Sequence, residues 1–182
     1  MALDQTVEDQ MKSTRTLTDR VSTYVPVYRG YRTKNLRRDE DRAIREEVVR
    51  TLEGAKADLA TVQRAALGNP DLMRDLERIR SKTDRYTMGI KKAINGYGGV
   101  WASMKVEEQE LSQVVEWDAR LVEEAATIRK EASELVEYID SGGLDLKKPL
   151  REFERSVDAM MENFSERNKV IKGLAGTEDV PE

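Results

Sequence analysis

The sequence predicts an all-α protein: an elongated up-down four-helix antiparallel bundle with coiled-coil-like packing, plus a short N-terminal helix. Apolar residues recur at steps of three and four over long segments, which is the period of one face of a helix. Turn residues are rare within those segments. Charged residues make up 36% of the 182 residues, and 31 basic and 35 acidic side chains leave a net charge of -4. Such a balance is typical of helices whose outer faces carry both signs.

The first two long helices are predicted over residues 33–67 and 70–94, joined by a very short turn. Gly68 suits a left-handed C-terminal cap, Asn69 an N-cap and Pro70 the first position of the next helix. A connection this short makes the two helices an antiparallel hairpin. The first helix carries one apolar stripe: Ile44, Val48, Leu52, Ala55, Leu59, Val62 and Ala66. The second carries Leu72, Leu76, Ile79, Thr83, Tyr86, Ile90 and Ile94.

The third and fourth long helices are predicted over residues 102–140 and 148–173. The third ends at "SGG", and its seam alternates steps of three and four, which favours left-handed packing. The seam consists of Leu111, Val114, Asp118, Leu121, Ala125, Ile128, Ala132, Leu135 and Ile139. The fourth presents Leu150, Phe153, Val157, Met160 and Phe164. The predicted organisation is an N-terminal amphipathic helix over residues 1–23, a helical bundle over 24–174 and a disordered tail over 175–182.

Asp118 is the one polar residue in the seam of the third helix. Two interpretations are open. In the first, which we prefer, Val115 and Trp117 share the buried face and Asp118 lies at its edge. In the second, a buried carboxylate pairs with a Lys, Arg or Tyr and fixes the register of the helices. A lone carboxylate without a second titratable group does not indicate catalysis.

The glycine-rich stretch "INGYGGVWASMKV" (residues 93–105) separates the second and third helices. It follows a helix and lacks the spacing of a nucleotide-binding loop, so a helix-to-helix bend is the preferred interpretation. In an up-down bundle the first and third helices start at the same end, which places this stretch beside residues 24–38. Together the two stretches form a predicted aromatic-basic pole, our candidate site for a partner or an anion: Tyr24, Tyr28, Arg29, Tyr31, Arg32, Lys34, Arg37, Arg38, Tyr97 and Trp101.

The positive charge of residues 29–38 opposes the dipole of the helix that follows, so negative charge is expected nearby. Pairing with acidic residues at the start of the third helix is the preferred interpretation. The alternative is an external anion, such as a lipid headgroup, a nucleic acid or an acidic partner. The internal candidates are Glu107, Glu108, Glu110, Glu116 and Asp118.

The chain contains neither Cys nor His, which excludes disulfides, thiol nucleophiles, zinc–thiolate sites and imidazole bases. The remaining side chains show no pair spaced as a nucleophile and its base, so we predict no catalytic residues, no metal and no cofactor. The sequence shows no segment with the apolar character of a signal-peptide core or a membrane span, which favours a cytoplasmic protein.

These observations favour a non-enzymatic interaction or scaffold protein that self-associates or binds protein partners through the aromatic-basic pole. A thin, elongated core makes a homo-oligomer the expected state. The alternative is a peripheral protein at the inner membrane face that binds anionic lipid through residues 24–38. A short N-terminal helix followed by a long hairpin resembles, in outline, the phage-shock and ESCRT-III-type membrane remodellers. Nucleic acid is not favoured as the main partner, because the sequence pI of about 5.2 is acidic.

Overall fold

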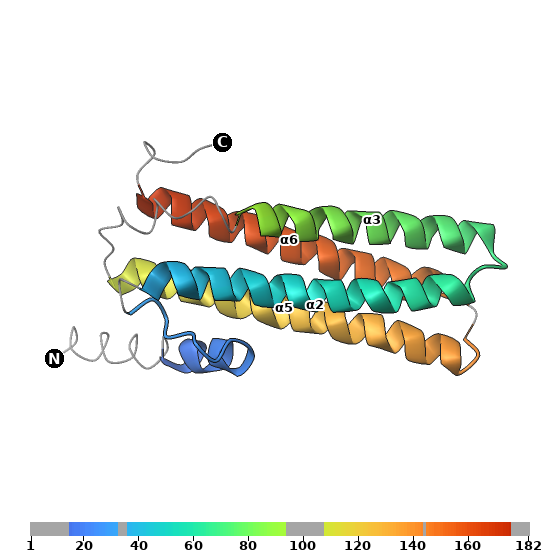
Figure 1. Ribbon diagram of the computed structural model, residues 1–182, viewed down its shortest axis with the longest axis horizontal. Coiled ribbons are helices and arrows are strands. Elements are labelled where there is room, and N and C mark those ends of the chain that lie inside the picture. The colour runs from blue at the N-terminus through green and yellow to red at the C-terminus, as the bar shows by residue number, and fades with distance from the viewer. Residues whose placement is uncertain (1–14, 33–35, 94–107, 144, 176–182) are drawn as a thin grey trace.

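The computed structural model describes residues 15–32, 36–93, 108–143 and 145–175 (Figure 1). Most of these residues belong to four long α-helices: α2 (Arg37–Ala65), α3 (Pro70–Ala93), α5 (Glu108–Asp140) and α6 (Lys147–Ala175). A short helix over residues 15–24 precedes them. The predicted all-α bundle is confirmed. The first part of the predicted N-terminal helix, the start of the third helix before residue 108 and the tail after residue 175 lie outside the described residues.

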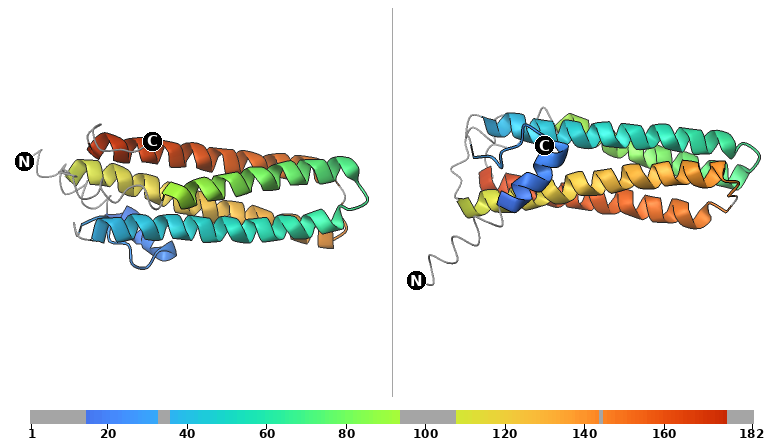
Figure 2. Two further views of the ribbon diagram at one scale, coloured as in Figure 1. Left: turned by 45° about the horizontal axis from the view of Figure 1, so that its top comes forward. Right: turned by 90° about the horizontal axis from the view of Figure 1, so that it is seen from below.

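The bundle consists of two antiparallel hairpins, α2–α3 and α5–α6, that lie side by side (Figures 1 and 2). α2 and α5 start at the same end and run parallel, as the up-down order predicts. They also form the most extensively packed pair, so they are direct neighbours and not diagonal partners. α3 packs mainly against α2 and more lightly against α6. The helix over residues 15–24 lies at the end of the bundle where α2 and α5 begin (Figure 2).

In the turn between α2 and α3, the predicted start of α3 is correct and the predicted cap at the end of α2 is not. Pro70 is the first residue of α3, and Asn69 caps the helix because its Oδ1 accepts a hydrogen bond from the Leu72 N–H at 3.2 Å. The predicted left-handed cap at Gly68 is wrong, since its φ is not positive. Instead the chain tightens after α2: the Ala66 carbonyl accepts the Asn69 N–H at 2.9 Å, which satisfies the helix end without a left-handed residue.

The "SGG" sequence ends α5 as predicted. Gly142 has a φ of 86°, and its N–H donates to the Ile139 carbonyl at 2.8 Å. The Gly143 N–H donates to the Tyr138 carbonyl at 2.9 Å. These two bonds form a Schellman motif, which requires a left-handed residue and therefore favours glycine.

The core follows the predicted apolar stripes. Every stripe position of α2 is buried, and so are the five apolar positions named for α6. In α5 the seam positions from Val114 to Leu135 are buried. The inward face of α3 also contains Thr83 and Thr87, whose hydroxyls donate to the backbone carbonyls one turn earlier at 3.0 and 2.8 Å. These bonds satisfy the two hydroxyls inside the core.

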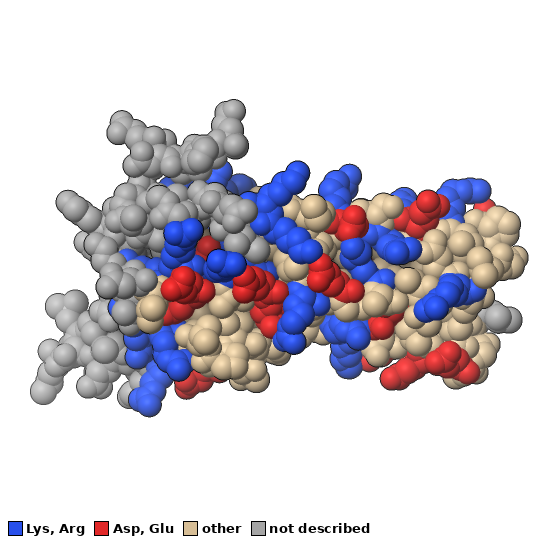
Figure 3. All heavy atoms as spheres, viewed as in Figure 1, with Lys and Arg blue, Asp and Glu red and all other residues tan. Residues whose placement is uncertain are grey.

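On the face of the bundle seen in Figure 3, charged side chains of both signs lie along the helices among uncharged ones. Several of them connect neighbouring helices. Lys82 of α3 lies 2.6 Å from Glu154 and 3.0 Å from Asp158 of α6, and Arg129 of α5 pairs with Asp58 of α2. Among the described helices, none combines the length and the apolar character that crossing a membrane requires.

Candidate anion-binding site

Residues 25–32, here called the strap, follow the short N-terminal helix and lead toward α2. At its turn, Gly30 has a φ of 71° and Tyr31 a φ of 59°. Glycine adopts such angles freely, whereas they cost a residue with a side chain about 1–2 kcal/mol. A Cβ at position 30 would also lie 2.8 Å from Thr18 Oγ1, so glycine is needed there. The strained backbone of Tyr31 must be held by the contacts around it.

The first turns of α2 hold the strap through Glu40. The carboxylate of Glu40, only 2% exposed, accepts hydrogen bonds through Oε2 from the backbone N–H of Arg29 at 3.0 Å and of Tyr31 at 2.9 Å. Arg37 binds the same turn, because its Nε donates to the Tyr31 carbonyl at 3.0 Å. The backbone of Tyr31 is therefore bonded at both its N–H and its C=O, which fixes its left-handed conformation.

Asp118 of α5 lies against the strap and is fully buried. Its Oδ2 accepts hydrogen bonds from the hydroxyl of Tyr28 at 2.8 Å and from that of Tyr31 at 2.5 Å. The two tyrosine rings pack edge to face, with centroids 5.4 Å apart and an angle of 84° between their planes, an arrangement that aromatic pairs favour. Arg167 of α6 donates through Nε to Asp118 Oδ1 at 2.5 Å. Asp118 therefore joins the strap to α5 and α6.

A second set of buried charges continues from Arg167 into α2. Nη2 of Arg167 lies 2.8 Å from Oδ1 of Asp41, and Nε of Arg45 donates to Oδ2 of Asp41 at 3.1 Å. The guanidinium of Arg45 also lies over the ring of Phe164, 5.2 Å from its centroid. Opposite charges thus balance inside the core, which is the condition under which buried charges are tolerated. We call the whole set the buried cluster: Tyr28, Tyr31, Asp41, Arg45, Asp118 and Arg167.

Burial and charge pairing set the protonation of this cluster. Burial raises the pKa of Asp118 above its ordinary value of 3.8, although Arg167 and the tyrosine hydroxyls oppose the shift. Burial would also raise the pKa of Asp41, but its two arginine neighbours together lower it below 3.8. The pKa values of Tyr28 and Tyr31 are raised well above 10.0 by burial and then by Asp118. Both tyrosines therefore stay protonated and act as hydrogen-bond donors that clamp the strap.

The burial of Asp118 decides between its two interpretations: the edge position is wrong, and the carboxylate pairs inside the core. Tyr28 and Tyr31 were predicted to serve a partner or an anion, but both are fully buried because the strap turns their hydroxyls onto Asp118. Arg37 is also buried and binds the strap. These three predicted site residues hold the site together from within.

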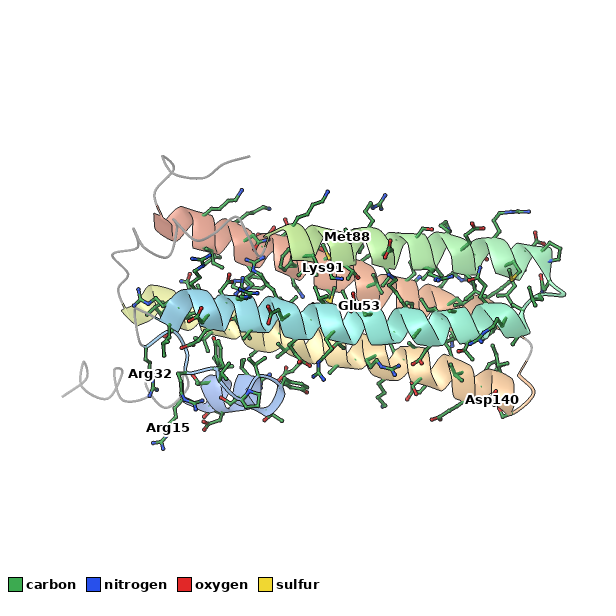
Figure 4. All side chains as sticks on the ribbon, viewed as in Figure 1. Arg15, Arg32, Glu53, Met88, Lys91 and Asp140 are labelled. Atoms are coloured by element: carbon green, nitrogen blue, oxygen red, sulfur yellow. The ribbon has the colours of Figure 1, made fainter. Side chains whose placement is uncertain are left out.

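The helix over residues 15–24 and the strap line a pocket of about 280 Å³ that is open to solvent, here called the arginine pocket. Ser22 connects its two walls, because its hydroxyl lies 2.8 Å from the Thr18 carbonyl and 3.2 Å from the Tyr28 carbonyl. Arg15 and Arg32, which come from the two walls, lie at the same end of the molecule (Figure 4). The lining residues are Arg15, Thr18, Asp19, Ser22, Tyr28, Arg29 and Arg32.

The arginines of this pocket form no ion pair with a carboxylate within the part of the chain that the structure describes. Nη1 of Arg29 donates instead to the carbonyls of Pro26 and Tyr28, each at 2.8 Å. The side chains of Arg15 and Arg32 are exposed, and Figure 3 shows basic side chains on the surface at this end. Asp19 is the one acidic residue in the lining, so the pocket carries an excess of positive charge.

We predicted that the basic stretch pairs with acidic residues at the start of α5. Two of these acids, Glu116 and Asp118, have described side chains, and neither pairs with the basic stretch. Glu116 pairs with Arg120, one turn further along α5, and Asp118 belongs to the buried cluster. The side chains of the other predicted acids lie outside the described residues. Glu123 binds Arg20 of the short N-terminal helix through hydrogen bonds of 2.8 and 2.6 Å. The described acids of α5 therefore leave the arginine pocket uncompensated.

The remaining predicted pole residues have different surroundings. Tyr24 is half-buried against the core, and Arg38 is exposed in the first turn of α2. Lys34, Tyr97 and Trp101 lie outside the described residues. The helix-to-helix bend predicted at residues 93–105, and its predicted position beside residues 24–38, therefore stay predictions.

Sequence reasoning missed several residues of the site. A signal for Arg167 was present, because it continues the apolar stripe of α6 at the helical spacing between Phe164 and Ile171. A charged residue at such a position marks a buried ion pair. Arg15 carried no comparable signal, since only the fold of the strap brings it beside Arg32.

Comparison of the chain with protein-family models, with curated proteins and with solved structures finds no match. Within the described residues, no group of acidic side chains is arranged to hold a metal ion. The arginine pocket and the buried cluster next to it are therefore the basis for assigning a function.

Proposed function

We propose that the protein is a non-enzymatic, cytoplasmic interaction module that binds an acidic protein surface through the arginine pocket. One observation carries the proposal. Arg15, Arg29 and Arg32 line one pocket and have no carboxylate partner among the described residues. Guanidinium groups in this state bind carboxylates through paired hydrogen bonds and attract them from a distance. A partner that presents several Asp or Glu side chains fits this charge.

Glu40 and the buried cluster support the proposal because they hold the site in place before a partner arrives. Glu40 holds the strap backbone at Arg29, and Asp118 holds the ring of Tyr28, which lines the pocket. A preorganised site loses less conformational entropy when it binds. The titratable groups of the cluster are bonded to one another, which suits a structural role beneath a binding surface.

A second copy of the chain is one partner that can offer such acidic groups, because the protein carries 35 acidic side chains and a net charge of -4. Such self-association would join the arginine pocket of one copy to an acidic surface of the next. Salt would weaken it by screening. Light scattering of the purified protein at low and high salt measures whether this homo-oligomer forms.

The direct test is binding of a fluorescent polyglutamate peptide, followed by anisotropy at low and high salt. We expect binding at low salt that high salt weakens. The variant Arg15→Gln/Arg32→Gln should lose it, and it should fold normally because both side chains are exposed. The control Arg151→Gln/Arg155→Gln removes the same charge from exposed positions of α6 and should bind like the wild type. Equal binding by both variants would reject the arginine pocket as the site.

A second candidate function, peripheral binding to an anionic membrane, is favoured by two exposed apolar residues that lie close in sequence to the same arginines. Val27 of the strap is 63% exposed and Leu36 is 46% exposed. Apolar side chains beside basic ones suit the interface of an anionic bilayer. Co-sedimentation with anionic and neutral vesicles tests this function. Val27→Ser should reduce vesicle binding and leave polyglutamate binding unchanged if the membrane is the partner.

A further inference from the structure

The charge of the arginine pocket exceeds what a single carboxylate can neutralise. Its lining contains three arginines and one aspartate, which gives a formal charge of +2. A carboxylate carries one negative charge, whereas a phosphate monoester carries about -1.5 to -2 at pH 7 and has three strong acceptor oxygens. Charge complementarity therefore favours a phosphate monoester over an Asp or Glu side chain.

The volume of the pocket is large enough for such a group and the first atoms that carry it. Its volume of about 280 Å³ is several times the roughly 30 Å³ that one water occupies in the liquid. The pocket can hold a tetrahedral phosphate together with the first carbon atoms of the group to which it is attached. The guanidinium of arginine is planar and matches two phosphate oxygens at once.

Arg29 and Arg32 extend from a strap whose backbone is held by hydrogen bonds. The N–H of Arg29 is bonded to Glu40, and so is the N–H of Tyr31, the residue before Arg32. On the opposite wall, the hydroxyl of Ser22 lies within hydrogen-bond distance of carbonyls on both segments. Binding therefore needs ordering of the arginine side chains but no refolding of either wall, which keeps its entropic cost low.

From this geometry we infer that the arginine pocket binds a phosphate monoester on a partner protein, that is, a phosphorylated serine or threonine side chain. The inference rests on the proposed function and names the chemistry of the group that the site takes. A protein is favoured over a lipid as the source, because an anionic bilayer presents many negative headgroups to a chain whose net charge is -4, whereas a protein can present a single phosphate to the pocket.

The test compares three synthetic peptides that differ at one position: phosphoserine, glutamate or serine, each flanked by glycines. Their affinities for the full chain are measured by NMR titration, using the phosphorus resonance of the phosphopeptide and proton resonances of all three. We expect the phosphoserine peptide to bind at least ten times more tightly than the glutamate peptide. Inorganic phosphate should displace it.

Two variants locate the binding. Arg15→Gln/Arg32→Gln should abolish binding of the phosphopeptide, whereas Arg15→Lys/Arg32→Lys should weaken it severalfold, because it keeps the charge and loses the paired hydrogen bonds. The control Arg151→Gln/Arg155→Gln should bind normally. Circular dichroism of each variant verifies that the helices are intact.

The outcomes separate this inference from the proposed function. Equal affinity for the phosphoserine and glutamate peptides would overturn the phosphate assignment and leave an acidic protein partner in place. Absence of binding to polyglutamate and to every peptide would overturn both. Binding to phosphatidic acid vesicles without binding to the phosphopeptide would overturn the protein source and assign the pocket to a lipid headgroup.

Discussion

Arg167 and Asp118 form an ion pair of 2.5 Å in which neither side chain is exposed to solvent. The pair joins α6 to α5. Asp41 of α2 lies 2.8 Å from the same guanidinium, so one arginine of α6 balances carboxylates that two other helices contribute. The end of the bundle that carries the arginine pocket depends on this arginine.

Replacing Arg167 with Met should therefore lower the free energy of unfolding by about 3–5 kcal/mol, because Asp118 and Asp41 lose a shared buried counter-charge. Urea unfolding followed by circular dichroism measures the loss. Lys169→Met is the matched control: it breaks the exposed pair with Glu166 and should cost less than about 1 kcal/mol. A loss for Arg167→Met as small as that of the control would contradict a stabilising role for the buried pair.

The Glu40→Ala variant tests how the strap is held. It removes the acceptor of two backbone N–H groups, and leaving such groups without a partner costs about 1–3 kcal/mol. Trypsin should then cut after Arg29 or Arg32 about ten times faster than in the wild type, because the strap opens more often. Glu46→Ala removes an exposed carboxylate from the same helix and should leave the rate unchanged. Equal rates for both variants would show that Glu40 does not fix the strap.

The stability of the protein should depend on pH through Glu131. Burial raises the pKa of this carboxyl above its ordinary value of 4.5, although the Ser156 hydroxyl, which donates to it at 2.9 Å, opposes the shift. A raised folded-state pKa means that Glu131 stabilises the fold below pH 4.5, and that this contribution is lost as the pH rises through the folded-state pKa. The Glu131→Gln variant has no charge to bury.

Glu131→Gln should therefore unfold at a higher temperature than the wild type at pH 7. At a pH near 4.5, the ordinary pKa of the carboxyl, this difference in unfolding temperature should be smaller. Thermal unfolding of both proteins at the two pH values measures the difference. Contributions from carboxyls distant from Glu131 are common to both proteins and cancel, whereas Glu134 and Glu152 interact with it and are part of the effect. A difference that stays constant between the two pH values would contradict a raised pKa for Glu131.

A buried leucine of the α5 seam gives a direct test of the core. Leu121 is fully buried, so Leu121→Asp places an unpaired charge among apolar side chains and should cost at least about 3 kcal/mol. Circular dichroism and thermal unfolding report the loss of the bundle. Leu67→Asp, at a position 73% exposed in the turn after α2, should leave both unchanged. An unaltered melting temperature for Leu121→Asp would mean that the seam does not form the core.

Much of the fold could be predicted from the sequence, because helix periodicity and caps are local. The α2 stripe from Ile44 to Ala66, the Asn69 cap and the Pro70 start all follow from residues close together in the chain. The mutual arrangement of the helices is not local: it takes side-chain packing to make α2 and α5 direct neighbours. Gly68 shows that even a local prediction can fail. A glycine at this position suggests a left-handed cap, but backbone hydrogen bonds end the helix without one.

The candidate site was harder to predict, because its parts meet only in the folded chain. Tyr28 and Tyr31 belong to a stretch whose composition suggests an exposed binding surface. In the structure the strap turns both side chains inward onto Asp118, which belongs to a helix distant in sequence. Periodicity placed Asp118 in the seam but could not supply the partner that makes its burial tolerable. That partner, Arg167, lies in the last helix. Arg15 joins the pocket only because the strap reverses the direction of the chain.

The hydrogen bond between Arg167 and Tyr31 connects residues 136 positions apart in the chain. During synthesis the ribosome delivers the strap first and its anchor in α6 last. The bonds from α2 to the strap backbone can form early, but the contact of Arg167 with the Tyr31 hydroxyl forms only after α6 has emerged and packed. Until then Asp118 and Tyr31 lack Arg167, so a nascent chain truncated before α6 cannot assemble the complete buried cluster beneath the arginine pocket. Completion of the buried cluster thus requires a helix that is made long after the strap.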